Sequence, residues 1–201
     1  MDKKRPKRPT RIVVKLGTNL LTGGKDALDL ETIGCIFAQI ASVKSSGVEV
    51  LIVSSGAVAA GRESLSRTPS KNKLQRGTVA YRQALAALGQ PQLMMTFAQL
   101  FSNHDVEVAQ ALISRGDLQS RSRYLNVRNT LDALISIGAV PIINENDVVA
   151  VEELAGEVYG DNDRLSAMVA NTVDADLLIL LGDMDGLHKT DQHIDPNSEL
   201  I

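Results

Sequence analysis

Short apolar runs alternate along this chain with segments whose apolar residues recur at helical spacing. Runs of this length bounded by Gly or polar residues predict buried strands, and spacings of three and four residues predict amphipathic helices. Strands separated by helices pair in parallel, so the alternation predicts an α/β fold with a mainly parallel sheet and helices on both faces. The predicted strands cover residues 11–16, 48–53, 106–113, 139–143 and 176–181.

The segments between these strands predict the helices. The connection that contains Pro91 predicts a helix pair, one helix near residues 79–88 and one after the proline, because Pro is favoured in a first helical turn. Residues 66–77 are polar, basic and without periodicity, which predicts a loop. The other helices are predicted near Leu30, after Gly56, near Leu125 and near Leu165.

Composition excludes several classes of protein. The chain is 44% hydrophobic but only 3% aromatic, which suffices for a core built mainly from aliphatic side chains. The single cysteine, Cys35, excludes a disulfide framework and a Cys-rich zinc site. Because the sequence shows no signal peptide and no long apolar span, we expect a soluble cytoplasmic protein with no membrane partner.

Charge is unevenly distributed. The formal net charge is −3, yet residues 1–10 hold five Lys or Arg and one Asp, which leaves 16 basic and 23 acidic residues elsewhere. This acidic excess argues against nucleic acid as the main partner. We expect the basic start to be a disordered tail, and an RNA-contacting arm is the alternative.

Several familiar catalytic motifs are missing from the sequence. It contains no Walker-type phosphate loop, no dinucleotide fingerprint and no nucleophile elbow. His104, His188 and His193 lie away from the predicted strand ends, which argues against a hydrolase triad. The polar residues at those ends are a lysine, glycines, serines and carboxylates, and this set suits phosphoryl transfer by positioning and charge.

Two of these strand-end segments offer groups for an anion. Lys15 lies near the end of a predicted buried strand, where its charge is costly unless it meets an anion, and Gly17 allows backbone N–H groups to approach a phosphate. The alternative is an edge lysine whose head reaches water. Ser54 and Ser55 precede a predicted helix and suit a carboxylate, although an ordinary N-cap is the favoured explanation when this segment is taken alone.

Three further segments follow later strands. Residues 144–147 (NEND) carry two amides and two acids that can grip an amino acid, and a polar turn is the alternative. Asp161, Asn162 and Asp163 begin a predicted helix, where Asp and Asn are common caps. A second carboxylate beyond the cap is more than capping needs, and it could orient lysines or Mg²⁺. Residues 182–187 (GDMDGL) form a turn in either interpretation.

Taken in order, these segments resemble the amino acid kinase family and, within it, the branch that phosphorylates glutamate. The resemblance runs from Arg11 to Ile201 and rests on VVKLGT (13–18), SSGAVAAG (54–61), ALGQ (87–90), INEND (143–147), GDND (160–163) and GDMDGL (182–187). It implies a three-layer α/β/α sandwich. The acceptor-binding half would span residues 11–173, and the nucleotide-binding half would begin at residues 174–201.

The resemblance also implies roles for individual residues. Lys15 matches the lysine that holds the ATP phosphates, and Asp163 matches the carboxylate that organises the catalytic lysines. Gly182 and Asp183 match the start of the nucleotide site. The residues that match the glutamate-binding positions are Ser55, Asp147 and Asn162.

The implied reaction is the phosphorylation of L-glutamate by ATP, the opening step of proline biosynthesis. Mg²⁺ is expected on the phosphates, with no residue of this chain assigned as its ligand. Proline is the expected feedback inhibitor, and a homo-oligomer is expected.

The chain also departs from the family pattern. Gly182 stands where the family often has Thr or Ser, and His188-Lys189 replaces the usual Tyr-Thr. The family's glycine-rich segment with a second phosphate-binding lysine would follow Ile201, so we expect the C-terminal part to be truncated. The alternatives are therefore a catalytically silent glutamate- or proline-binding module and another amino acid kinase. Asp147 argues against acetylglutamate as the acceptor, since that molecule lacks a free ammonium.

Overall fold

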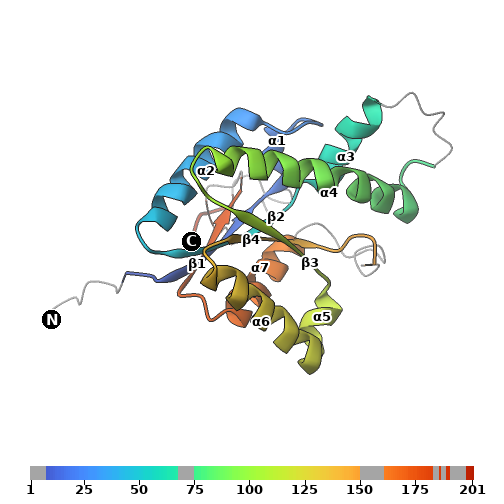
Figure 1. Ribbon diagram of the computed structural model, residues 1–201. Coiled ribbons are helices and arrows are strands. Elements are labelled where there is room, and N and C mark those ends of the chain that lie inside the picture. Colours follow the sequence, from blue (N-terminus) through green and yellow to red (C-terminus); the bar gives the residue numbers. More distant parts are fainter. Residues whose placement is uncertain (1–7, 68–74, 150–160, 183–185, 187–188, 191–197) are drawn as a thin grey trace.

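Five parallel strands form a sheet in the described part of the computed structural model, in the order β3-β4-β2-β1-β5 (Figure 1). The structure describes residues 8–67, 75–149, 161–182, 186, 189–190 and 198–201. Its elements are β1 (Arg11–Leu16), α1 (Thr18–Thr22), α2 (Leu30–Ser45), β2 (Glu49–Ser54), α3 (Ala57–Ser66), α4 (Val79–Ser102), β3 (Val108–Ile113), α5 (Arg115–Gln119), α6 (Arg121–Ser136), β4 (Val140–Glu145), α7 (Asp161–Thr172) and β5 (Leu177–Leu181).

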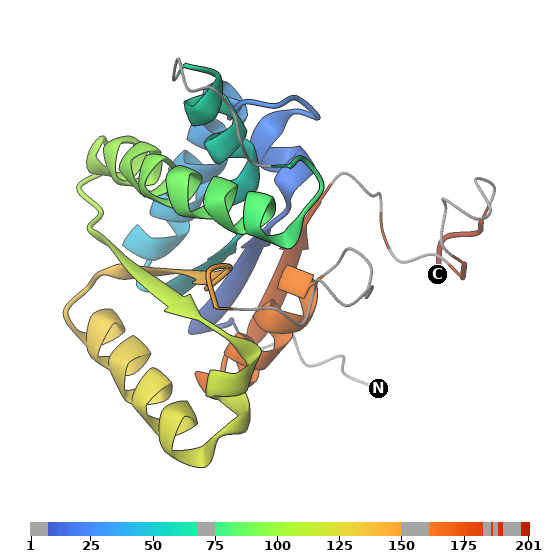
Figure 2. The same ribbon diagram turned by 90° about the vertical axis from the view of Figure 1, so that its right-hand side faces the viewer.

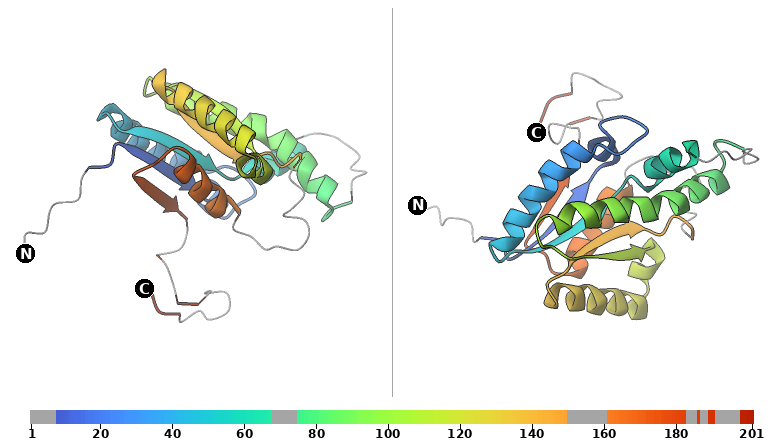
Figure 3. Two further views of the ribbon diagram at one scale, coloured as in Figure 1. Left: turned by 90° about the horizontal axis from the view of Figure 1, so that it is seen from below. Right: turned by 45° about the horizontal axis from the view of Figure 1, so that its top comes forward.

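Helices cover both faces of this sheet, with α2 and α4 on one face and α6 and α7 on the other (Figure 3). Strand residues alternate between the two cores, as the pleat requires. Val14 and Ile52 pack toward α2 and α4, whereas Val13 and Leu51 pack toward α6 and α7. The predicted three-layer α/β/α sandwich is therefore confirmed.

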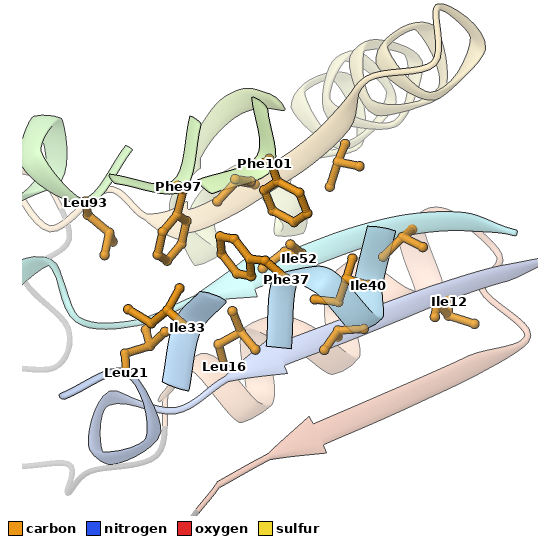
Figure 4. Packing of buried hydrophobic residues seen from close by; sticks show 14 of the residues in the cluster. Ile12, Leu16, Leu21, Ile33, Phe37, Ile40, Ile52, Leu93, Phe97 and Phe101 are labelled. Atoms are coloured by element: carbon orange, nitrogen blue, oxygen red, sulfur yellow. The ribbon is translucent and has the colours of Figure 1, made fainter. Parts of the chain in front are cut away.

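Three phenylalanines fill the core between the sheet and helices α2 and α4 (Figure 4). The ring of Phe37 stacks on Phe101 with centroids 4.1 Å apart and meets the edge of Phe97 at 4.8 Å. All three side chains are fully buried. This aromatic contact fixes α2 against the second half of α4.

The predicted helix pair at residues 79–101 is wrong. Helix α4 is continuous and contains Pro91. An interior Pro removes one helical hydrogen bond, at a cost of about 3 kcal/mol. Packing on both sides of the proline offsets this cost, because Leu85 is buried before Pro91 and Leu93 and Phe97 are buried after it.

Two short helices, α1 and α5, were not predicted. Each has five residues, too few to show a helical period. A local signal for α5 does exist, since Ser114 and Asp117 form a reciprocal capping box. The Ser114 hydroxyl and backbone N–H donate to Asp117 and hold the pKa of this carboxyl below its usual value.

Arg11 anchors the end of the sheet opposite the candidate site. Its guanidinium donates to Glu49 at 2.7 Å, to Asp132 at 3.0 Å and to the Val173 carbonyl at 2.5 Å. Burial alone would lower the pKa of Arg11, but the bonds and charges of Glu49 and Asp132 outweigh it and raise the pKa. Within the predicted tail, Thr10 donates to Asp176 at 2.7 Å, and residues 1–7 lie outside the described residues.

We expect Arg11→Met to lower the free energy of unfolding by about 1–3 kcal/mol, the scale for losing charge-assisted hydrogen bonds at a partly buried site. Arg128→Met is the matched control, because Arg128 pairs with Asp174 and Asp132 at the more exposed rim of the same network. The control should cost clearly less, because exposed ion pairs contribute little to stability. Urea unfolding measures both, and equal losses would contradict an anchoring role for Arg11.

Candidate active site

The carboxyl ends of the parallel strands meet at one edge of the sheet. Strand pairing aligns Leu16 with both Ser54 and Leu181. Backbone hydrogen bonds continue one residue further, since Gly17 N–H donates to the Leu181 carbonyl at 3.0 Å and Ser55 N–H donates to the Leu16 carbonyl at 3.2 Å. The segments that follow β1, β2 and β5 are thus neighbours, and Figure 2 shows β1 beside β5.

Lys15 points toward α7. Its side chain shares the sheet face of Val13, which packs with the α7 residues Leu165 and Val169. The ammonium Nζ lies 2.6 Å from Oδ1 of Asp163, and the exposed fractions are 15% for the lysine side chain and 50% for the aspartate. The charge of a mostly buried lysine is therefore balanced on one side, while the carboxylate still reaches solvent.

Gly17 makes room beside this ion pair. A Cβ at residue 17 would lie 3.5 Å from Lys15 Nζ, 3.3 Å from the Leu181 carbonyl oxygen and 3.7 Å from Gly182 Cα. Gly17 therefore borders the lysine ammonium with backbone atoms alone, and the backbone of Gly182 lies beside Gly17. Such a bare backbone beside a cation allows the close approach of a phosphate.

Asn162 connects α7 to the end of β2. Its Nδ2 donates to the Ser54 carbonyl at 3.0 Å and to Ser55 Oγ at 2.7 Å. Because a carbonyl only accepts, these contacts fix the orientation of the amide. Asn162 Oδ1 is buried and has no hydrogen-bond partner among the described residues. Ser55 accepts from Asn162, so its hydroxyl hydrogen can be donated elsewhere.

The N-cap interpretation of Ser55 is wrong. Gly56, at φ 94°, occupies the N-cap of α3, and no side chain forms a cap hydrogen bond there. The positive φ favours glycine at this position. The side chains of Asn162 and Asp163 likewise reach β2 and β1 rather than the backbone of α7.

Residues 144–147 form the end of β4 and the start of the turn after it, at the same edge of the sheet. Asn146 N–H donates to the Ile113 carbonyl at 3.1 Å, which ties this turn to the end of β3. The side chain of Asn144 is buried and donates to Gln90 of α4 at 2.9 Å. Asp147 is half-buried. The hydrogen bond to Gln90 was not predicted, although the ALGQ motif was among the marks of the resemblance.

The structure thus brings together several of the predicted site residues. Lys15 pairs with Asp163, Ser55 bonds Asn162, and Gly182 lies beside Gly17. Asp147 lies at the same sheet edge, on the turn after β4. Asp183 lies outside the described residues. In the described part of the chain, no helix is long and apolar enough to cross a membrane.

A sequence model of the amino acid kinase family matches residues 10–201, and the chain belongs to this family. It is 51% identical over 192 residues to a glutamate 5-kinase of Dehalococcoides mccartyi, and the aligned region covers 95% of this chain and 50% of that protein. It is 46% identical over 201 residues to a glutamate 5-kinase of Citrifermentans bemidjiense, with coverage of 100% and 52%.

The chain therefore spans about half the length of the curated relatives that it matches. A UMP kinase from Bacillus anthracis has a similar fold, with a TM-score of 0.57 at 15% identity over 96% of this chain and 73% of that chain. The predicted resemblance to the family is confirmed.

We expect Lys15→Met to lower the rate of phosphoryl transfer by about 100-fold or more, the scale for removing one preorganised donor from a transition state. Methionine keeps an apolar chain of similar length in place of the lysine stem, so the melting temperature should change little. Lys44→Met, at a partly exposed position in the last turn of α2, is the control for loss of a positive charge. Steady-state kinetics and thermal unfolding measure both effects, and a near-normal rate in Lys15→Met would contradict the assignment.

Proposed function

We propose that this chain carries the acceptor site and the first part of the nucleotide site of a glutamate 5-kinase, which transfers the γ-phosphoryl group of ATP to the side-chain carboxylate of L-glutamate. The first turn of α7 carries the proposal. Asn162 bonds Ser55, and the next residue, Asp163, pairs with Lys15. One helical turn links polar side chains suited to an amino acid with a cation suited to a phosphoryl group.

Ser55, Asp147 and Asn162 are proposed to bind glutamate. The Ser55 hydroxyl and the backbone N–H groups at the start of α3 suit a carboxylate. Asp147 is proposed to pair with the ammonium of the substrate in a charge-assisted hydrogen bond. The buried oxygen Oδ1 of Asn162, which lacks a partner among the described residues, offers a second acceptor to that ammonium after a small side-chain movement.

The chemistry requires no general base. The ordinary pKa of a glutamate side chain is about 4.3, so the acceptor is already a carboxylate near neutral pH. One of its oxygens bonds the γ-phosphorus while the bond to the bridging oxygen breaks and ADP leaves. Because two anions must approach each other, the main requirement is a cation. Lys15 is proposed to stabilise the transferring group, and Asp163 to orient the lysine.

Gly17 and Gly182 are proposed to border the phosphates of ATP, and Asp183 retains its proposed role in the nucleotide site. Mg²⁺, when bound, would neutralise phosphate charge. Among the described residues, no group of three or more His, Cys, Asp or Glu is placed to hold a metal ion.

The division into an acceptor-binding half (residues 11–173) and the start of a nucleotide-binding half (residues 174–201) belongs to the same proposal. So do feedback inhibition by proline, assembly into a homo-oligomer and a cytoplasmic location. The sequence and its resemblance to the family support these parts of the proposal, and no contact within this chain carries them.

The direct test incubates the protein with ATP, Mg²⁺, L-glutamate and hydroxylamine, and γ-glutamyl hydroxamate is the expected product. Calorimetric titration with glutamate on the same chain separates binding from turnover. Binding without hydroxamate would restrict the proposal to the acceptor site. Absence of glutamate binding would overturn it.

Asp147→Asn should weaken glutamate binding by about 30-fold or more, since it removes the charge that pairs with the substrate ammonium. Glutarate, which lacks the ammonium, is the matched ligand control and should bind both proteins equally weakly. If Asp147→Asn weakened ATP binding instead, the residue would belong to the nucleotide side.

A further inference from the structure

We propose that Gln90 is a positioning residue for the acceptor pocket, and that it acts through the side chain of Asn144. Gln90 lies on α4, and Asn144 lies at the end of β4, three residues before Asp147. The inference deepens the proposed function, because it concerns how the pocket for glutamate is held in shape. It rests on contacts that exist without any ligand.

Both the nitrogen and the oxygen of the Asn144 side-chain amide form hydrogen bonds. Its Nδ2 donates to Gln90 Oε1 at 2.9 Å, and its Oδ1 accepts from the Glu145 N–H at 2.9 Å. Since the Glu145 N–H can only donate, Oδ1 must face it and Nδ2 must face Gln90. The exposed fractions are 9% for Gln90 and 3% for Asn144, so little water can replace either bond. Gln90 thereby fixes the backbone where the turn toward Asp147 begins.

The residue before Gln90 connects the same helix to the other side of the pocket. A Cβ on Gly89 would lie 1.8 Å from the Ala57 carbonyl oxygen and 2.3 Å from the Gly61 nitrogen. A Cβ on Gly61 would lie 1.9 Å from the Leu85 carbonyl oxygen. Helices α3 and α4 are therefore in backbone contact, and they lie side by side in Figure 1 and in the right-hand view of Figure 3.

Helix α3 begins two residues after Ser55, so adjacent residues of α4 touch the two sides of the proposed pocket. Gly89 meets the start of α3 beside the Ser55 turn, and Gln90 holds the turn that leads to Asp147. A displacement of α4 would move both turns together. The hydrogen bond from Asn144 to Gln90 therefore sets the spacing between Ser55 and Asp147, which must match the length of the acceptor.

A buried amide pair can also serve stability alone, and the two roles differ in what they change. If the pair is purely structural, its loss should lower the melting temperature and reduce the affinity for glutamate and for ATP equally. If the pair positions the acceptor site, its loss should reduce the affinity for glutamate but not for ATP. The phosphate side should be unaffected, because the contact of Lys15 with Asp163 involves neither α4 nor β4.

The first experiment compares Gln90→Met with Gln90→Glu by calorimetric titration. Gln90→Met keeps the length of the side chain but removes the acceptor, and it should weaken glutamate binding by about 10-fold or more. ATP affinity should change by less than about twofold. Gln90→Glu keeps an oxygen facing Asn144 in either protonation state and should restore most of the glutamate affinity. Gln92→Met, exposed on the same helix, is the matched control and should change neither affinity.

The second experiment needs no ligand. Hydrogen exchange of the Glu145 amide should be faster in Gln90→Met and near normal in Gln90→Glu, because that amide donates to Asn144. If Gln90→Met does not fold, Gln90→Asn provides the test, since its amide is one methylene short of Asn144 and glutamate affinity should fall in that variant too.

Equal losses of glutamate and ATP affinity, or a lower melting temperature with unchanged glutamate affinity, would overturn the role of Gln90. A different result would overturn the proposed function alone. In that case the unsubstituted chain would bind no glutamate, yet Glu145 exchange would still respond to Gln90→Met and recover in Gln90→Glu.

Discussion

The candidate site depends on a lysine ammonium held near the end of a buried parallel strand. Lys15 occupies the same sheet face as Val13, so its stem packs under α7 and its charge meets Asp163. Removing an ammonium from water is costly unless an anion lies close by. The partner is a half-exposed carboxylate, and Gly17, which has no side chain, also borders the ammonium. A phosphoryl group brings the negative charge that such a position favours.

The fold supplies the remaining parts through parallel topology. The ends of β1, β2 and β5 are held level by their pairing, so residues far apart in the sequence become neighbours. Helix α7 then connects two of these ends through consecutive residues, Asn162 and Asp163. Helix α4 connects the Ser55 turn to the turn after β4, because Gly89 allows backbone contact with α3 and Gln90 bonds Asn144.

Much of this architecture could be predicted from the sequence. The apolar runs gave each described strand to within a few residues, because a buried parallel strand must be apolar on both faces. Helix α4 was predicted incorrectly because tertiary packing on both sides of Pro91 overrides a local helix breaker. The five-residue helices α1 and α5 are too short for any periodicity to show.

The site was predictable as a set of residues but not as a set of contacts. Motifs at strand ends indicated Lys15 and Ser55, and a motif at a helix start indicated Asp163. The pairing of Ser55 with Asn162, however, joins positions more than a hundred residues apart. Such a pairing depends on strand order, which one sequence does not reveal. Gln90 had no local signal of function, since a glutamine on a helix is ordinary until its buried partner is known.

The most direct test of this account is the location of bound glutamate, measured by backbone amide chemical shifts during a titration of the isotopically labelled protein. The account predicts that the amides of Ser55, Asp147 and Asn162 shift together and saturate with a single dissociation constant. The chemical shifts of amides at the opposite end of the sheet, around Arg11 and Asp132, should not change. Chemical-shift changes confined to that opposite end, or no changes at saturating glutamate, would contradict the proposed acceptor site.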